Sequence, residues 1–225
     1  LSSGEIVEQV LYYARSLSLQ GEAVTNVVLM GMGEPFHNYA ATLAAIERLS
    51  DPEGMNLGQR RFTISTVGLA PEIRKFAARK SQVNLAISLH AADDELRSSM
   101  LPINKKYPLA ELIAACQEYI ALTHRRISFE WALIAGVNDT PEQARRLASL
   151  LQPLRLSGTL LAHVNAIPLN PTARYTGQAS TLQRARAFQE ELDKHGVPCT
   201  IRLRRGIDIQ AGCGQLAGTT QAAAP

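Results

Sequence analysis

The 225-residue sequence has few cysteines and no long hydrophobic run. Its three cysteines, Cys116, Cys199 and Cys213, are odd in number and widely spaced, so they indicate neither a disulfide framework nor a zinc site with paired C-x-x-C ligands. This usage is typical of a reducing compartment. No apolar run approaches the roughly 18 residues of a membrane-spanning helix, and no basic segment precedes an apolar one as in a signal peptide. We therefore expect a cytoplasmic protein without a membrane partner.

Charged residues make up only 19% of the chain and hydrophobic residues 46%, which is ordinary for a globular domain and excludes a disordered one. The length suits a single α/β barrel with a full hydrophobic core. The net charge of +3 permits an acidic partner such as RNA without establishing one.

The sequence also lacks an initiator methionine. Ser2 and Glu5 form the S-x-x-E pattern of a capping box, and apolar residues follow at helical spacing from Ile6. This pattern predicts a helix that begins at the first residues of the chain. We therefore expect a fragment or a truncated gene product whose upstream part is missing.

Strands and helices are predicted to alternate along the rest of the sequence. Short apolar runs bounded by Gly or Pro are typical of strands buried on both faces, as parallel strands are. The predicted strands cover residues 27–30, 61–66, 83–89, 127–134, 160–167 and 198–203. The predicted helices cover residues 38–49, 71–79, 109–123, 141–151 and 181–195, with Thr140 capping the fourth and Ser180 the fifth. This alternation indicates a parallel sheet in a full or partial barrel.

Small or hydrogen-bonding residues recur where these strands end. Barrel enzymes place their chemistry at the C-terminal ends of the strands, so these residues are candidate ligand contacts. They are Gly33, Glu34, Ser65, Ser88, His90, Asn138, Asn165 and Asn170. Each alone fits an ordinary turn, strand cap or structural hydrogen bond. Their common placement at one rim favours a binding site.

Cys213 lies between two glycines, shortly after Arg204 and Arg205. Its neighbours give the thiol nothing to pack against and leave the backbone free to move. It is either an incidental thiol in a surface turn or a reactive group, and the flanking arginines suit a phosphate backbone. Cys116, in an apolar helical segment, and Cys199, in the last predicted strand, are expected to pack in the core.

Six motifs together resemble the radical-SAM RNA methyltransferases that modify carbon 2 of adenine in 23S ribosomal RNA and tRNA. The motifs are Gly31-Met32-Gly33-Glu34-Pro35, Ser65-Thr66-Val67-Gly68, Ser88-Leu89-His90-Ala91, Gly136-Val137-Asn138-Asp139, Asn165-Ala166-Ile167-Pro168-Leu169-Asn170-Pro171 and Ala211-Gly212-Cys213-Gly214-Gln215-Leu216. The resemblance implies a partial (βα)6 TIM-like barrel of the radical-SAM type. We assign residues 1–218 to this catalytic barrel and residues 219–225 to a disordered tail.

The resemblance implies that the barrel binds S-adenosylmethionine. In that scheme Gly33 and Glu34 hold the methionine amino group. The residues that contact the ribose and carboxylate region are Ser65, Ser88, Leu89 and His90. Asn170 meets the adenine side.

The resemblance further implies that Cys213 carries a methyl group. One S-adenosylmethionine methylates its thiolate, and a second is cleaved by an electron from a [4Fe-4S] cluster to a 5'-deoxyadenosyl radical. This radical takes hydrogen from the S-methyl group, and the resulting carbon radical adds to adenine. The implied partners are 23S rRNA, tRNA and a flavodoxin-type electron donor, and nothing in the sequence demands more than a monomer.

The sequence departs from the family in what precedes its first helix. The family's C-x-x-x-C-x-x-C cluster loop, its second catalytic cysteine and its N-terminal RNA-binding region are absent, and the three cysteines present are too far apart to replace the loop. Gly212 also stands where the family has Ala. We therefore expect a barrel without its first strand and cluster loop, inactive alone.

Two alternatives stay open. The related methyltransferases that act on carbon 8 of adenine share most of these motifs. A non-catalytic barrel that binds S-adenosylmethionine or RNA, and has lost its cluster, fits the missing loop. An ordinary phosphate-binding barrel enzyme is disfavoured, because the rim has neither a lysine base nor a cluster of metal ligands.

Overall fold

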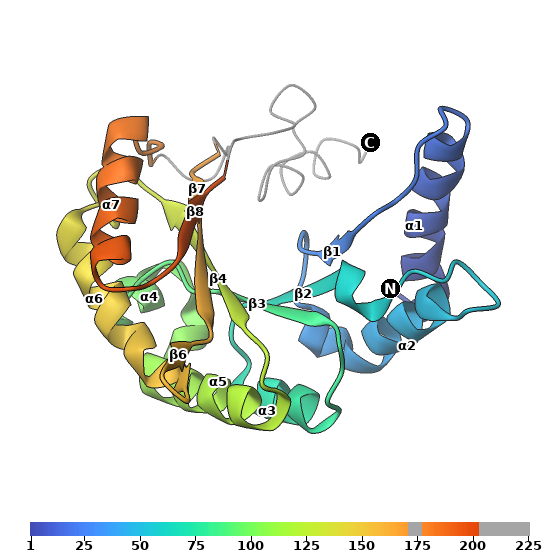
Figure 1. The fold of residues 1–225 in the computed structure, drawn as a ribbon, viewed down its shortest axis with the longest axis horizontal. Coiled ribbons are helices and arrows are strands. Elements are labelled where there is room, and N and C mark those ends of the chain that lie inside the picture. The colour runs from blue at the N-terminus through green and yellow to red at the C-terminus, as the bar shows by residue number, and fades with distance from the viewer. Residues whose placement is uncertain (171–176, 203–225) are drawn as a thin grey trace, which may run out of the picture. The chain divides into compact units, whose positions relative to one another are not determined.

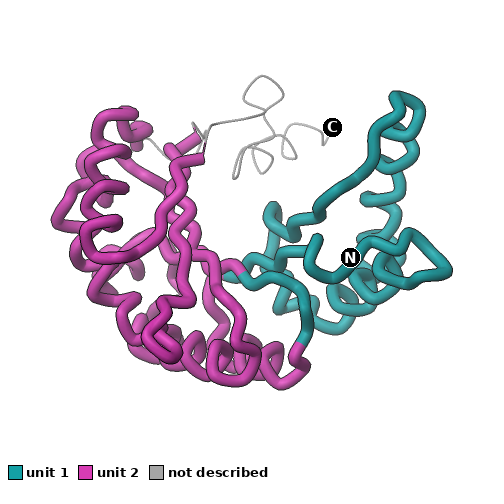
Figure 2. The backbone as a smooth tube through the Cα atoms, in the orientation of Figure 1, with its two compact units in different colours: residues 1–66, 81–85 teal, residues 67–80, 86–225 magenta. Residues whose placement is uncertain are grey.

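The structure is a computed structural model that describes residues 1–170 and 177–202. The chain divides into two compact units, shown in teal and magenta in Figure 2. Unit 1 comprises Leu1–Thr66 and Ser81–Leu85. Unit 2 comprises Val67–Lys80 and the described residues from Ala86 onward. Cys213 and the expected tail lie outside the described residues.

Unit 1 begins with a helix, as the sequence predicts (Figure 1). Its elements are α1 (Ser3–Ser18), β1 (Val27–Leu29), the 3-10 helix η1 (Pro35–Asn38), α2 (Tyr39–Ser50), the 3-10 helix η2 (Gln59–Arg61) and β2 (Phe62–Thr66). The capping box is confirmed, since Glu5 N donates to Ser2 Oγ at 3.3 Å and Ser2 N donates to Glu5 Oε2 at 2.7 Å. Helix α1 packs against α2, whose inner face buries Leu43, Ile46 and Leu49.

Strand β1 is less buried than the sequence predicts. Its central residue, Val28, is 58% exposed, and neither Val27 nor Leu29 is fully buried. The expectation of burial on both faces is therefore wrong for this strand. The reason is its position, because β1 lies at the edge of the sheet that the described residues form, where its partner is β2, with Val27 opposite Phe62.

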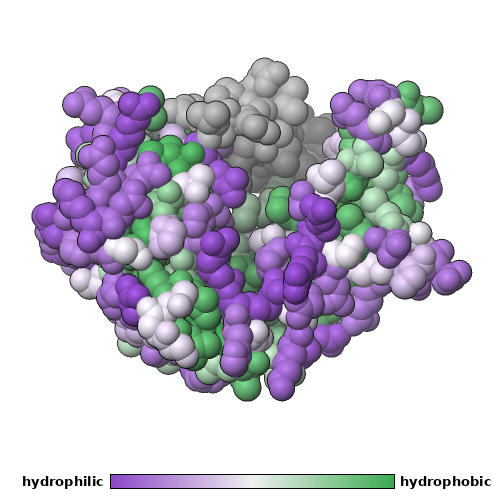
Figure 3. Space-filling model, in the orientation of Figure 1, coloured by the Kyte–Doolittle hydropathy of each residue, from purple (hydrophilic) through white to green (hydrophobic). Residues whose placement is uncertain are grey.

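Unit 2 contains most of the alternating helices and strands. Its elements are α3 (Ala70–Ala78), α4 (Asp94–Met100), the 3-10 helix η3 (Pro102–Lys105), α5 (Leu109–Thr123), β4 (Ile127–Leu133), α6 (Pro141–Leu151), the 3-10 helix η4 (Gln152–Leu154), β5 (Arg155–Leu156), β6 (Thr159–Leu160), β7 (Ala162–Pro168), α7 (Leu182–Lys194) and β8 (Cys199–Ile201). Strand β3 (Asn84–Ser88) begins in unit 1 and ends in unit 2. Hydrophilic side chains cover the outer surface of α6 and α7 (Figure 3).

The strands form a sheet in the order β1-β2-β3-β4-β7-β8. The pairs β1–β2, β4–β7 and β7–β8 are parallel. Each strand thus lies beside the strand that follows it through a helical connection, apart from the small β5–β6 hairpin. This arrangement confirms the predicted α/β class and the parallel, barrel-type order of strands.

The two faces of β4 and β7 differ in chemistry. Phe129, Trp131 and Leu133 are fully buried on one face, where the Trp131 ring lies 5.6 Å from the ring of Phe188 in α7. Alternation along the strand places Glu130 on the opposite face, beside Asn165 of β7. The helix-covered face is therefore the core of unit 2, and the other face carries polar groups.

Three features of unit 2 differ from the sequence prediction. Helix α4 and the β5–β6 hairpin were not predicted, because both are too short to show a clear period. The cap of α7 is Thr181, whose Oγ1 accepts from Arg184 N at 3.3 Å, and not Ser180. The Ser180 hydroxyl instead donates to Asp139 Oδ2 at 2.7 Å.

In the part of the chain that the structure describes, no helix is both long and apolar enough to cross a membrane.

Candidate cofactor site

The turn that follows β3 is the best-defined part of the site. Its backbone amides at Leu89 and His90 both donate to the carbonyl oxygen of Glu130, at 3.1 and 3.4 Å. His90 has a φ of +61°, a left-handed conformation that is uncommon for a residue with a side chain. The Asn138 side chain stabilises this conformation by donating from Nδ2 to the His90 carbonyl at 2.8 Å. The turn of Ser88, Leu89 and His90 is therefore fixed from several sides.

The His90 imidazole has a defined protonation state. Its Nδ1 atom accepts a hydrogen bond from the backbone N–H of Ala132 at 3.0 Å, so Nδ1 carries no proton. Burial lowers the pKa of His90 to about 4, and the nearby Arg97 charge acts in the same direction. At neutral pH the ring is therefore uncharged with its proton on Nε2, which makes it a hydrogen-bond donor and not a general base.

Asn138 has a structural role at this rim. It is fully buried, and its Oδ1 accepts from Ile134 N at 2.8 Å while its Nδ2 also donates to Ala132 O at 2.7 Å. The expectation that Asn138 is a ligand contact is therefore wrong, because its amide is used to join the end of β4 to the His90 turn.

Asp139, the next residue, is also buried and paired. Arg184 donates to both of its carboxylate oxygens, at 2.6 and 2.7 Å, and Ser180 donates to one. Burial opposes ionisation, but these hydrogen bonds outweigh it and lower the pKa of Asp139. The pair attaches the first turn of α7 to the loop after β4.

Arg97 is the residue of this site that sequence reasoning missed. It lies on α4 and is completely buried, and its guanidinium donates to the carbonyls of Val67 (2.7 Å), Ser88 (3.2 Å) and Leu89 (3.2 Å). Burial lowers its pKa to about 10, so it stays charged at neutral pH. The available signal was Asp93, a helix-capping residue type three positions after His90.

Two asparagines of unit 2 present unpaired acceptors. The Oδ1 atom of Asn170 is buried and has no hydrogen-bond partner among the described residues. Asn165, 5% exposed, donates from Nδ2 to Glu130 Oε1 at 2.8 Å, while its own Oδ1 is likewise unpartnered there. Burial raises the pKa of Glu130, although the Asn165 hydrogen bond opposes the change. Buried polar atoms without partners are uncommon, so these are candidate ligand contacts.

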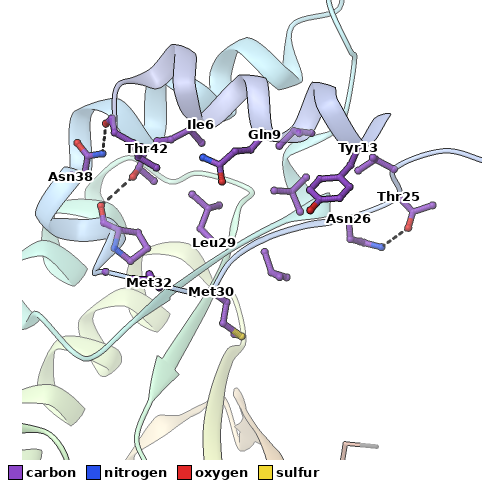
Figure 4. Close-up of a pocket in the computed structure, with 18 of the residues that line it drawn as sticks. Ile6, Gln9, Tyr13, Thr25, Asn26, Leu29, Met30, Met32, Asn38 and Thr42 are labelled. Carbon is purple, nitrogen blue, oxygen red and sulfur yellow. Dashed lines mark hydrogen bonds between the residues drawn. The ribbon is translucent and has the colours of Figure 1, made fainter. Parts of the chain in front are cut away.

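Gly33, Glu34 and Ser65 lie in unit 1, where Gly33 and Glu34 line a cavity of about 760 Å³ (Figure 4) and Ser65 lies outside the lining. Ile6, Gln9 and Tyr13 of α1 point toward the segment that carries Leu29. The cavity lining continues through residues 30–35, which include Gly33 and Glu34.

Gly33 and Glu34 differ in what they offer a ligand. Gly33 has a φ of +89°, and an added Cβ there would meet no atom of the described residues within 4 Å, so these residues leave the space above its backbone open. Glu34 Oε1 accepts from Phe36 N at 3.0 Å and thereby caps η1. Ser65, in β2, is 7% exposed.

The structure thus gathers Ser88, Leu89 and His90 in one turn of unit 2, which also contains Asn170. Gly33, Glu34 and Ser65 belong to unit 1. Cys213 lies outside the described residues.

The described residues do not fit an iron–sulfur cluster. Residues 1–170 and 177–202 contain no group of three or more His, Cys, Asp or Glu side chains suited to a metal ion. Cys116 and Cys199 are buried, as predicted, and burial raises the pKa of each thiol to about 12. Both therefore stay protonated, whereas cluster ligands are thiolates.

Residues 4–151 match the model of the radical SAM superfamily. The chain is 51% identical over 223 residues to a probable dual-specificity RNA methyltransferase RlmN of Chloroflexus aurantiacus, covering 97% of this chain and 59% of that protein. It is 49% identical to the dual-specificity RNA methyltransferase RlmN 1 of Myxococcus xanthus, covering 98% of this chain and 60% of that protein. The chain therefore spans about three-fifths of the length of these relatives.

Solved structures agree with these matches. A radical SAM methyltransferase from Sphaerobacter thermophilus superposes with a TM-score of 0.90 at 49% identity, covering 96% of this chain and 61% of that one. A domain of a pyruvate-formate lyase-activating enzyme from Bacteroides vulgatus, 17% identical with a TM-score of 0.56, shares the fold. From the family match over residues 4–151, we conclude that the chain belongs to the radical SAM superfamily.

Proposed function

We propose that this chain is the catalytic barrel of an RNA methyltransferase that uses S-adenosylmethionine to methylate carbon 2 of adenine in 23S rRNA and tRNA. The observation that carries the proposal is the 51% identity over 223 residues to a relative named as a dual-specificity RNA methyltransferase. We further propose that the protein acts as a cytoplasmic monomer with a flavodoxin-type electron donor.

The radical SAM family uses S-adenosylmethionine and a [4Fe-4S] cluster. The described residues fit the first of these, because they offer a fixed donor at His90 Nε2 and an unpaired acceptor at Asn170 Oδ1. S-Adenosylmethionine supplies the methyl group. In unit 2 we propose that Ser88, Leu89 and His90 contact its ribose and carboxylate region and that Asn170 faces its adenine.

In unit 1 we propose that Gly33 and Glu34 contact the methionine amino group and that Ser65 contacts the ribose region. The open space at Gly33 supports a close approach of ligand to backbone. A carboxylate such as Glu34 attracts an ammonium group.

We propose Cys213 as the residue that carries the methyl group. Methyl transfer to sulfur needs a thiolate, and the buried thiols of Cys116 and Cys199 are held protonated. That leaves Cys213, which lies outside the described residues, as the thiol best suited to the reaction. Because the described residues hold no cluster ligands, we expect the 225-residue chain to bind S-adenosylmethionine weakly at best and not to turn over.

Mass spectrometry of RNA nucleosides tests the activity. The protein produced from the start codon of its gene is purified anaerobically and incubated with S-adenosylmethionine, a flavodoxin reducing system and unmodified 23S rRNA or tRNA. We expect 2-methyladenosine from the wild type and none from Cys213→Ala. A product of 8-methyladenosine would point to the carbon-8 alternative. Binding of S-adenosylmethionine without any methylated nucleoside would point to the non-catalytic alternative.

A further inference from the structure

We propose that Arg97 is a positioning residue that fixes the Ser88–His90 turn in its ligand-binding geometry. This inference rests on the proposed contact between that turn and S-adenosylmethionine. Arg97 itself has no proposed contact with the ligand, since its guanidinium is fully buried behind the turn.

The guanidinium joins two segments that are distant in the sequence. Its Nη2 atom donates to the Val67 carbonyl at 2.7 Å and to the Ser88 carbonyl at 3.2 Å, and its Nε donates to the Leu89 carbonyl at 3.2 Å. Val67 follows β2, whereas Ser88 ends β3. Arg97 thus determines where two consecutive carbonyls of the turn point.

The turn needs such partners because its conformation is unfavourable by itself. His90 has a left-handed backbone, which a side chain disfavours, and it persists only where surrounding contacts stabilise it. Arg97 binds the carbonyls at Ser88 and Leu89, and Asn138 binds the carbonyl at His90. Three consecutive carbonyls of the turn are therefore held by buried side chains of the protein.

The surroundings of Arg97 are shaped for a guanidinium. Asn104, 1% exposed, accepts from Nη1 at 2.8 Å and is itself oriented by Asp94, whose Oδ1 accepts from Asn104 Nδ2 at 2.8 Å. At Gly68 an added Cβ would lie 3.2 Å from Arg97 Nη2 and 3.1 Å from Leu112, so the missing side chain leaves room for the group.

Lysine cannot replace this arrangement. Its ammonium places three donors on one atom, whereas the Arg97 acceptors lie around a planar fork and include both Val67 O and Asn104 Oδ1. Arg97→Lys keeps the positive charge and loses the fork. This substitution therefore separates positioning from a purely electrostatic role.

The test compares the 225-residue wild type with Arg97→Lys and with Leu147→Ala, which shortens a buried side chain of α6 far from the turn in sequence. Two quantities are measured at a temperature where circular dichroism shows all three folded. The first is hydrogen exchange at the Leu89 and His90 amides, and the second is affinity for S-adenosylhomocysteine by calorimetry. In Arg97→Lys we expect exchange at least tenfold faster at these amides and affinity at least tenfold weaker. We expect neither change in Leu147→Ala.

The outcomes separate this inference from the proposed function. Unchanged exchange and affinity in Arg97→Lys would overturn the positioning role, as would equal losses in Leu147→Ala. The proposed contact between the turn and the ligand would be wrong if the wild type does not bind S-adenosylhomocysteine, or if His90→Ala binds it as tightly as the wild type. In either case, hydrogen exchange at the Leu89 and His90 amides still shows whether Arg97 fixes the turn. If Arg97→Lys does not fold, the same two measurements are made on Asn104→Ala. We expect exchange threefold to tenfold faster and affinity threefold to tenfold weaker in this variant. No change in either quantity would count against the proposal.

Discussion

The Nδ1 atom of His90 lies 3.0 Å from the backbone nitrogen of Ala132, so a main-chain N–H of β4 determines which ring nitrogen can carry a proton. Protonating Nδ1 would place two donors against each other. The contact and the burial of the ring therefore both favour the neutral form, in agreement with a pKa lowered to about 4.

Stability is predicted to fall in weak acid because of His90. Its pKa in the folded chain, about 4, lies below the ordinary value of 6.5, so the unfolded state binds the proton first as pH decreases. The contribution is complete above pH 6.5 and is lost between pH 6.5 and 4. Because residue His90 as a whole is intermediate in exposure, we expect a loss of roughly 2 kcal/mol, less than the full value for such a pKa difference. Urea unfolding at pH 7 and pH 4 measures it. In His90→Asn, whose asparagine tolerates the left-handed backbone, the free energy of unfolding should differ less between the two pH values. A difference equal to that of the wild type would show that other groups cause the effect.

Breaking the Asp139–Arg184 pair is predicted to destabilise the chain. Arg184→Ala leaves the buried Asp139 carboxylate without its cation, so the free energy of unfolding should decrease. Because the arginine side chain is 45% exposed, solvent screens the pair, and the decrease should be smaller than for a fully buried ion pair. The pKa of Asp139, lowered in the folded state, should rise toward its usual value. Because a lowered carboxylate pKa contributes stability above the unfolded value and loses it in acid, the variant should be less sensitive than the wild type to a decrease in pH below 4. Urea unfolding across pH 3–7 checks both points, and Arg186→Ala on the same helix serves as the control.

Thiol labelling is predicted to distinguish Cys213 from the other two cysteines. Cys116 and Cys199 are buried with pKa values raised to about 12, so they should react with a disulfide reagent only after unfolding. The native chain should rapidly release one equivalent of the reagent's thiol, and the Cys213→Ala variant should release none. Fast release of two or three equivalents from native protein would contradict the buried state of Cys116 and Cys199.

The Trp131–Phe188 contact is predicted to be a major part of the unit 2 core. Both side chains are fully buried, and the indole Nε1 donates to Asn138 O at 3.1 Å. Phe188→Ala should cost about 3–4 kcal/mol, because it leaves a cavity against the indole. Since Trp131 is the chain's single tryptophan, fluorescence during urea unfolding reports directly on this contact. Phe188→Leu keeps most of the side-chain volume, so it should lower the free energy of unfolding clearly less than Phe188→Ala does.

The features that the sequence predicted are those that depend on nearby residues. The Ser2–Glu5 capping box and the Thr140 cap are local patterns, and the burial of Cys116 follows from the apolar period of its helix. The edge position of β1 depended on the order of strands, which no pattern within residues 27–30 contains.

Arg97, which the sequence missed, and Asn138, whose role it predicted wrongly, both bind partners far along the chain. Arg97 binds the carbonyl of Val67, 30 positions earlier, and a carbonyl acceptor leaves no trace in residue identity. Asn138 was predicted to face a ligand because it follows a strand, yet its amide binds His90 O, 48 positions earlier. Residue type thus identified polar residues near strand ends, whereas the direction of the Asn138 side chain depended on tertiary contacts.

The Glu130–Asn165 hydrogen bond has a consequence for how such sequences diverge. The two residues face each other in the β4–β7 register and are both nearly inaccessible to water. Replacing one of them leaves the other buried without its hydrogen-bond partner. Replacing both with apolar residues of similar volume leaves no buried polar group that needs a partner. Substitutions at these two positions should therefore be inherited together, and an evolutionary path between the polar and apolar pairs must pass through a less stable intermediate.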